Sequence, residues 1–222
     1  MTAVFGIKTK KYISIVSDGR VIKNSTNTVE TDMHNKIHRI PSPNNEFIIA
    51  VAGNFLIFED YIFPELKTVF QSQVFGEKDI ERVLLEVTTR VLKEKYTEVV
   101  SKYTCWKRIV QYFKKENIME LQYLFAAKVN NKLFLNTYIF NNYDLTENEQ
   151  ISTNDITYIG TWRAQIKSIL IPNRKGKIIS GKNSKQVEGE LSKIIKELSL
   201  ETGKTQINPI GNKTFSDNLK LK

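Results

Sequence analysis

The chain has 222 residues and a formal net charge of +9, from 33 lysine and arginine residues against 24 aspartate and glutamate residues. The basic residues are spread along the chain, without a basic helix or an aromatic–basic pattern, so its charge does not favour a nucleic-acid partner. The one cysteine, Cys105, excludes an internal disulfide framework, and no apolar stretch approaches the roughly 20 residues that span a bilayer. We therefore expect one domain over 1–222, located in the cytoplasm without a membrane partner.

The first quarter of the chain is predicted to contain four strands separated by polar turns. Residues 12–17 are rich in β-branched and aromatic side chains, and residues 34–40 alternate apolar with polar ones. Residues 47–52 form the continuous run Phe-Ile-Ile-Ala-Val-Ala, which is typical of a strand buried on both faces. The predicted strands are residues 2–8, 12–17, 34–40 and 47–52.

Beyond Gly53 the apolar residues recur at helical spacing. Helices are predicted over 55–73, with Pro64 as a kink or break, over 77–102 and over 103–116; the last belongs to a helical insertion around 103–117. Strands over 121–129 and 132–140 follow, joined by a two-residue turn at Asn130-Asn131. The remaining predictions are a strand over 155–159, a helix over 161–171 stopped by Pro172, a helix over 184–200, and extended pieces over 205–210 and 213–215. Because strands are grouped with strands and helices with helices, the order favours an α+β fold with two antiparallel sheets between helical layers.

Residues with reactive or charged side chains lie at the ends of the first predicted strands. Thr2 carries a hydroxyl and, once Met1 is removed, a free α-amine whose ordinary pKa of about 7.7–8 lets it act as a base for that hydroxyl. If the strands pair side by side, Asp18 and Lys36 meet Thr2 at one end of a sheet. The lysine would then stabilise negative charge on the threonine oxygen, and the carboxylate would hold the lysine charged and oriented. A backbone N–H near the end of the fourth strand would stabilise a tetrahedral oxyanion.

Four elements carry a family resemblance: Thr2-x-x-x-Gly6-Ile7, Ser17-Asp18-Gly19-Arg20, Lys36-Ile37-x-x-Ile40 and Ala50-Val51-Ala52-Gly53. Together they resemble the proteasome β-subunit family of N-terminal-nucleophile hydrolases, nearest in style to the bacterial ATP-dependent proteasome-like protease core. The resemblance implies a four-layer αββα sandwich of N-terminal-nucleophile hydrolase type and a threonine endopeptidase. It implies that Thr2 is the nucleophile, that Asp18 orients Lys36, that the Ala50 N–H binds the oxyanion and that Thr161 supports the terminal amine. It further implies no cofactor, a peptide or unfolded protein as substrate, a homo-oligomeric ring and an ATPase partner.

Departures from the family pattern leave two alternatives open. Ala50 stands where the family usually has glycine, Trp162 replaces the small residue expected after Thr161, and residues 200–205 do not clearly supply the late support for the amine. The uncertain support for the amine and Trp162 favour a catalytically silent structural or interaction subunit. An amidase that acts on a small molecule is the other alternative. No metal site is expected, because His34 and His38 are the two histidines and lie in an extended segment where they cannot share a helical face.

Overall fold

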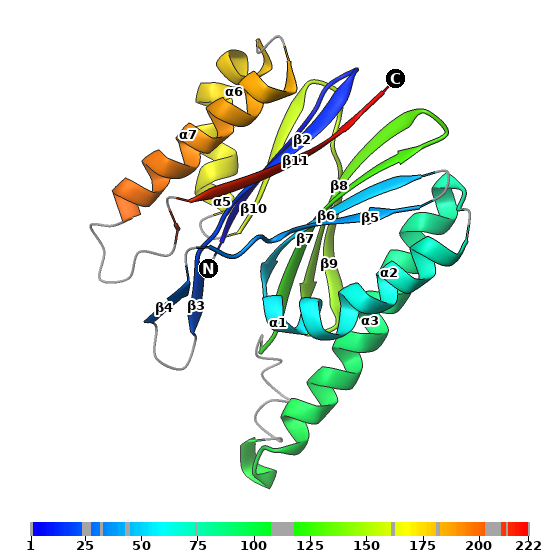
Figure 1. Ribbon diagram of the computed structural model, residues 1–222. Coiled ribbons are helices and arrows are strands. Elements are labelled where there is room, and N and C mark those ends of the chain that lie inside the picture. Colours follow the sequence, from blue (N-terminus) through cyan, green and yellow to red (C-terminus); the bar gives the residue numbers. More distant parts are fainter. Residues whose placement is uncertain are drawn as a thin grey trace.

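The computed structural model describes residues 2–23, 28–31, 33–42, 45–73, 75–107, 118–160, 163–180, 183–202, 210–211 and 213–221. Two antiparallel sheets lie face to face, and helices cover the outer face of each (Figure 1). The predicted four-layer αββα arrangement is therefore confirmed. The prediction of one domain over 1–222 stays a prediction, and residues 108–117 of the expected insertion lie outside the described part of the chain.

The first sheet has the strand order β10-β1-β2-β11, and the second has the order β5-β6-β7-β8-β9. The bounds in the first sheet are β1 (Ala3–Lys8), β2 (Tyr12–Asp18), β10 (Asp155–Gly160) and β11 (Thr214–Lys220). Those in the second are β5 (Ile37–Pro41), β6 (Glu46–Gly53), β7 (Glu120–Val129), β8 (Lys132–Asn141) and β9 (Asp144–Gln150). A separate hairpin pairs β3 (Val21–Lys23) with β4 (Thr28–Thr31).

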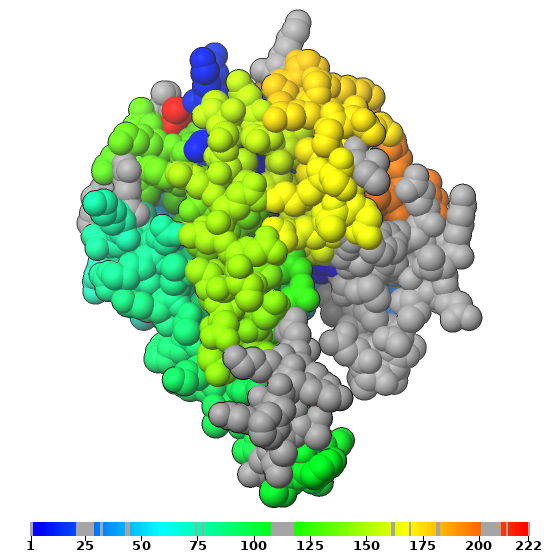
Figure 2. Space-filling model, turned by 180° about the vertical axis from the view of Figure 1, so that it is seen from behind, coloured from blue at the N-terminus to red at the C-terminus, as the bar shows by residue number. Residues whose placement is uncertain are grey.

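The helices form two groups, one on each outer face (Figure 1). Against the second sheet lie α1 (Phe55–Ile57), the π-helical segment η1 (Phe58–Ile62), α2 (Phe63–Ser72) and α3 (Glu77–Ser101). Against the first sheet lie α5 (Arg163–Gln165), the π-helical segment η2 (Ile166–Leu170), α6 (Ile171–Ile179) and α7 (Ser184–Thr202). Seen from behind the view of Figure 1, β9 runs between α3 and the α5–α6 segment (Figure 2). Arg163 of α5 forms an ion pair there with Glu147 of β9.

Three apolar clusters fill the spaces between the four layers, and β6 contributes to two of them. Phe47, Ile49 and Val51 face the helices α2 and α3, whereas the intervening Ile48, Ala50 and Ala52 belong to the core between the sheets. This alternation explains why the sequence of β6 is apolar at every position from 47 to 52. The third cluster joins the first sheet to α6 and α7.

Several boundaries differ from the sequence prediction. The turn at Asn130-Asn131 is confirmed, with φ of 49° and 59°, as a two-residue hairpin with positive φ at both central residues requires. Pro172 was predicted to end a helix, but it lies in the first turn of α6, which continues directly from the π-helical segment η2. Strand β9 was not predicted, because its sequence is polar and all seven residues are exposed, which removes the apolar alternation that marks a strand.

Candidate active site

Three buried polar side chains meet where the two sheets come together. Thr2 precedes β1, Asp18 ends β2 in the same sheet, and Lys36 directly precedes β5 in the other sheet. Their exposed fractions are 5%, 0% and 1%, respectively. A lysine and an aspartate are rarely this buried unless they are paired, so the local contacts must satisfy both charges.

Among the described residues, three acceptors lie within hydrogen-bond distance of the Lys36 ammonium. Its Nζ donates to Thr2 Oγ1 at 2.9 Å, to Asp18 Oδ1 at 3.1 Å and to the carbonyl oxygen of Arg20 at 2.6 Å. An ammonium has three N–H donors, and these three acceptors match them in number. Lys36 is thereby fixed beside the Thr2 hydroxyl and bridges that hydroxyl to a carboxylate.

Asp18 is the anion at the centre of the cluster. Its Oδ1 accepts hydrogen bonds from the Ala3 N–H at 2.8 Å and from Lys36, and its Oδ2 accepts from the Arg20 N–H at 3.2 Å and the Gly211 N–H at 3.0 Å. Charge-assisted bonds of this kind offset the free-energy cost of burying a carboxylate. Asp18 also ties the backbone of Ala3, just after Thr2, to Gly211, which lies 193 positions beyond Asp18.

The Thr2 backbone is held by the end of β10. Gly160 lies opposite Ala3, and its φ of +117° brings it so close to the Thr2 carbonyl that a Cβ at position 160 would lie 2.0 Å from that oxygen. The Gly160 N–H donates to Gln122 Oε1 at 2.8 Å, and the Tyr158 hydroxyl donates to the Thr2 carbonyl at 3.4 Å. Burial and the nearby charge of Asp18 raise the pKa of Tyr158, so its hydroxyl stays protonated and able to donate.

Sequence reasoning missed Gln122, Tyr158, Gly160 and Gly211 as parts of this arrangement. Each acts through a contact between elements distant in the sequence. Gly160 stands in the element Ile159-Gly160-Thr161, in which the resemblance assigned a role to Thr161 alone. Gly160 carried one local signal, since a glycine that ends a predicted strand is a frequent site of positive φ. Gln122 carried another, because it is a polar residue within the otherwise apolar run of β7.

The structure does not bring Ala50 to this cluster as an N–H donor, which corrects its assignment as the oxyanion site. Hydrogen-bonded and non-bonded positions alternate along antiparallel strands. The Val51 N–H donates to Lys36 O on the β5 side, and the Asn54 N–H donates to Glu120 O on the β7 side, so the Ala50 N–H is directed at Leu124 of β7. Its methyl group is buried in the core between the sheets. Thr161 lies outside the described residues.

His34 and His38 approach a common carboxylate on η1. Glu59 Oε1 lies 3.1 Å from His34 Nε2 and 3.6 Å from His38 Nε2, and the second distance is too long for a hydrogen bond. Burial, together with the charge of His34, lowers the pKa of His38 to about 4, so its ring is neutral near pH 7 and packs against Phe58 and Phe63. Among the residues described, no group of three or more histidine, cysteine, aspartate or glutamate side chains is arranged to hold a metal ion.

This geometry defines a buried threonine–lysine–aspartate cluster on an αββα scaffold. A cation 2.9 Å from the threonine oxygen stabilises negative charge that develops there when the oxygen attacks an electrophile. The Asp18 carboxylate lies 3.1 Å from the Lys36 ammonium and orients it toward the threonine. Within the described ranges, no helix is long and apolar enough to cross a membrane.

Comparison with solved structures identifies the same fold in proteasome-like proteins. Anbu (ancestral beta-subunit) from Yersinia bercovieri matches with a TM-score of 0.61 and 11% identity over 98% of this chain and 81% of its own. The Anbu complex from Pseudomonas aeruginosa, described as a helical assembly, matches with a TM-score of 0.64 and 10% identity over 98% of this chain and 81% of its own. BPH from Thiobacillus denitrificans matches with a TM-score of 0.60 and 11% identity over 99% and 98% of the two chains.

These findings correct the family assignment made from the sequence. No family model matches the chain, and no curated protein matches it. The neighbours named here are Anbu proteins and BPH, not the bacterial ATP-dependent protease core, and identities of 8% to 11% show the fold alone. The chain therefore has a proteasome-like fold, and the assignment to the proteasome β-subunit family is wrong at the level of sequence.

Proposed function

We propose that this protein is a proteasome-like subunit with N-terminal threonine peptidase activity, and that it acts in the cytoplasm. One observation carries the proposal: Lys36 Nζ lies between Thr2 Oγ1, at 2.9 Å, and Asp18 Oδ1, at 3.1 Å, in a buried site. This arrangement places a cation against the hydroxyl of Thr2, where it would stabilise negative charge on an attacking oxygen. The fold shared with Anbu proteins supports the same proposal.

In the proposed reaction, removal of Met1 frees the α-amine of Thr2. The amine accepts the hydroxyl proton as Thr2 Oγ1 forms a bond to the scissile carbonyl carbon, and Lys36 stabilises the charge on that oxygen. The C–N bond then breaks, and the proton passes to the leaving amine. Water hydrolyses the resulting ester, which restores the hydroxyl and releases the carboxylate product. Asp18 acts by orienting Lys36 and does not touch the substrate.

Self-association belongs to this proposal. The Pseudomonas aeruginosa neighbour forms a helical assembly, and a subunit of similar fold is expected to assemble with copies of itself. A peptide or unfolded protein substrate and an ATPase that delivers it complete the proposal.

Hydrolysis of fluorogenic peptides tests this function. We expect activity in the wild-type protein, a loss of at least about a hundredfold in Thr2→Ala, and partial activity in Thr2→Ser, which keeps a hydroxyl. Thr68→Ala is the matched control, because Thr68 is an exposed threonine on α2 whose hydroxyl bonds only locally to Pro64 O. Equal activity in Thr2→Ala and the wild-type protein would refute the proposal.

A silent structural subunit is the second candidate, favoured by the direction of the Ala50 N–H into the β6–β7 pairing. This reading predicts that the protein loses Met1 and self-associates but hydrolyses no peptide. Hydrolysis of small-molecule amides without peptide hydrolysis would instead favour an amidase.

A further inference from the structure

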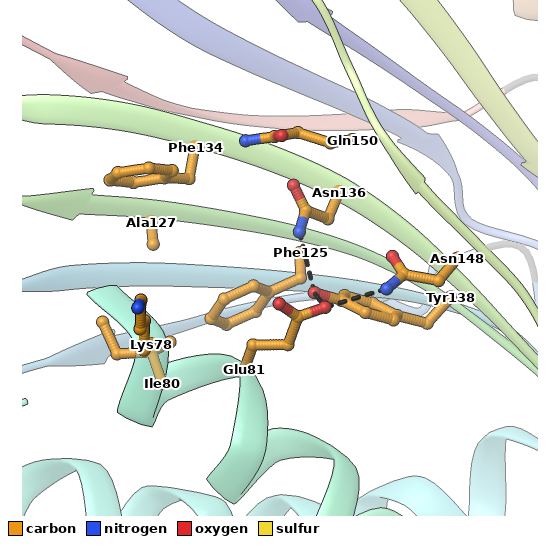
Figure 3. Close-up of a pocket in the computed structure, with 10 residues that line it drawn as sticks. All are labelled: Lys78, Ile80, Glu81, Phe125, Ala127, Phe134, Asn136, Tyr138, Asn148 and Gln150. Carbon is orange, nitrogen blue, oxygen red and sulfur yellow. Dashed lines mark hydrogen bonds between the residues drawn. The ribbon is translucent and has the colours of Figure 1, made fainter. Parts of the chain in front are cut away.

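A second site lies on the outer face of the second sheet, away from Thr2. It is a cavity of about 370 Å³ between the first turns of α3 and the strands β7, β8 and β9 (Figure 3). Pockets that hold small molecules start at roughly 300 Å³. The side chains that line it divide into an apolar wall and a polar wall, and this division determines the kind of ligand that fits.

The polar wall is a connected hydrogen-bond network that contains a carboxylate and a buried amide oxygen. Asn136 Nδ2 donates to the Tyr138 hydroxyl at 2.8 Å, and that hydroxyl donates to Glu81 Oε1 at 3.2 Å. Asn148 Nδ2 donates to the same Glu81 oxygen at 2.8 Å. One N–H of each of these two amides is engaged in the network, while Asn136 Oδ1 is buried without a hydrogen-bond partner among the described residues.

Both of these contacts to Glu81 fall on Oε1, so its other carboxylate oxygen keeps capacity to accept. Burial raises the pKa of Tyr138, and the charge of Glu81 raises it further, so the hydroxyl remains a donor toward Glu81. A buried carbonyl oxygen without a partner is unfavourable. A ligand that brings a protonated amine to Glu81 and Asn136 Oδ1 would satisfy both.

The apolar wall provides room for a large side chain beside that amine. Phe125 and Ala127 project from β7, and Phe134 projects from the facing position of β8. Aromatic rings at a pocket wall favour an aromatic or large aliphatic group, and they tolerate a neighbouring ammonium group. Lys78 lines the same cavity three residues before Glu81 on α3, which places both charges on one side of the helix.

We propose that this pocket binds a free α-amino group attached to an aromatic or large aliphatic side chain, as in an apolar amino acid or the first residue of a short peptide. The ammonium contacts Glu81 and Asn136 Oδ1, the side chain packs against Phe125 and Phe134, and the carboxylate or next peptide carbonyl lies toward Lys78. Figure 3 shows Glu81 turned toward Tyr138 and Asn148, which both donate to its Oε1.

This pocket is separate from the candidate active site. Residues 125 and 127 of β7 face α3. Gln122, which accepts the hydrogen bond from the Gly160 N–H, lies on the opposite face of the strand. Along β7, residue 122 is about 10 Å from residue 125, at roughly 3.4 Å per residue. The proposal therefore does not depend on peptidase activity, and Thr2→Ala is expected to bind the ligand as the wild-type protein does.

Isothermal titration calorimetry with L-phenylalanine on the full chain tests the proposal. We expect saturable binding at one site per chain, no binding of N-acetyl-phenylalanine, and an affinity at least about tenfold weaker in Glu81→Gln. Glu86→Gln is the matched control, because Glu86 is an exposed glutamate on the same helix, paired with Arg82 and outside the pocket. It is expected to bind as the wild-type protein does.

The dipeptide Phe-Gly distinguishes the two sources of the ligand. Tighter binding of the free amino acid supports the proposal with an amino acid as ligand, and tighter binding of the dipeptide supports it with a peptide. The acetylated ligand keeps the test valid even if Glu81→Gln fails to fold. Absence of saturable phenylalanine and dipeptide binding, or equal binding of phenylalanine and its acetylated form, would overturn the proposal.

Discussion

The contact between Gly160 and Thr2 makes a quantitative prediction about position 160. Gly160→Ala places a Cβ 2.0 Å from the Thr2 carbonyl oxygen, and it does so on a backbone with φ of +117°. A non-glycine residue in such a sparsely populated conformation costs on the order of 1–3 kcal/mol, and overpacking a filled site costs about 1–3 kcal/mol more. The atom that is struck belongs to the backbone, so no side-chain rotation relieves the contact.

We therefore expect Gly160→Ala to lower the free energy of unfolding by roughly 3–5 kcal/mol, measured by urea denaturation. The remaining folded protein should also be impaired in peptide hydrolysis, since the Thr2 backbone has to move. Gly189→Ala is the matched control: Gly189 lies inside α7 and an added Cβ would meet nothing within 4 Å. It should stabilise the protein by about 0.5–1 kcal/mol.

A free energy of unfolding for Gly160→Ala within about 0.5 kcal/mol of the wild-type value would refute this contact. The same conclusion follows if Gly189→Ala is the more destabilising of the two substitutions.

Three further substitutions test other contacts. Lys36→Met leaves the buried charge of Asp18 with its backbone donors alone, and urea denaturation should show a loss of about 3 kcal/mol or more; a loss below 1 kcal/mol would contradict the ion pair. Gln122→Met leaves the Gly160 N–H without its acceptor, so the free energy of unfolding should fall by about 1–3 kcal/mol, and an unchanged value would count against this contact. The pKa of His38 is lowered from 6.5 to about 4, so the unfolded chain binds this proton first as the pH falls. The free energy of unfolding is therefore expected to fall by an amount on the order of 3 kcal/mol as the pH drops from 6.5 to 4. Urea denaturation at several pH values should show a flatter pH dependence in His38→Phe. An unchanged pH profile in that variant would refute the role of His38.

The sequence predicted the layers of the fold because each layer leaves a periodic signal. The apolar run 47–52 and the helical spacing of 77–102 are local patterns, and β6 and α3 follow them closely. The π-helical segments and the continuation of the helix through Pro172 left no such signal, because they depend on how the helix packs on the sheet. The polar strand β9 is held by its pairing with β8 rather than by its own side chains.

The candidate site was predictable only in part. Thr2, Asp18 and Lys36 stand at strand ends, where residue type and spacing can be read from the sequence. Gly211 reaches Asp18 from the far end of the chain, and Gln122 reaches Gly160 from the other sheet, so their positions follow from tertiary packing alone. Ala50 shows the opposite error: its place in a motif predicted an N–H donor to the site, whereas strand pairing directs that N–H toward β7.

Intact mass spectrometry after incubation with a peptide epoxyketone reports on the nucleophile itself, because that reagent needs both the hydroxyl and the free amine of an N-terminal threonine. We expect that the wild-type protein lacks Met1 and gains the mass of one reagent per chain, and that Thr2→Ala lacks Met1 but gains nothing. Retention of Met1, or equal labelling of the two proteins, would contradict the claim that Thr2 is a nucleophile activated by its own α-amine and Lys36.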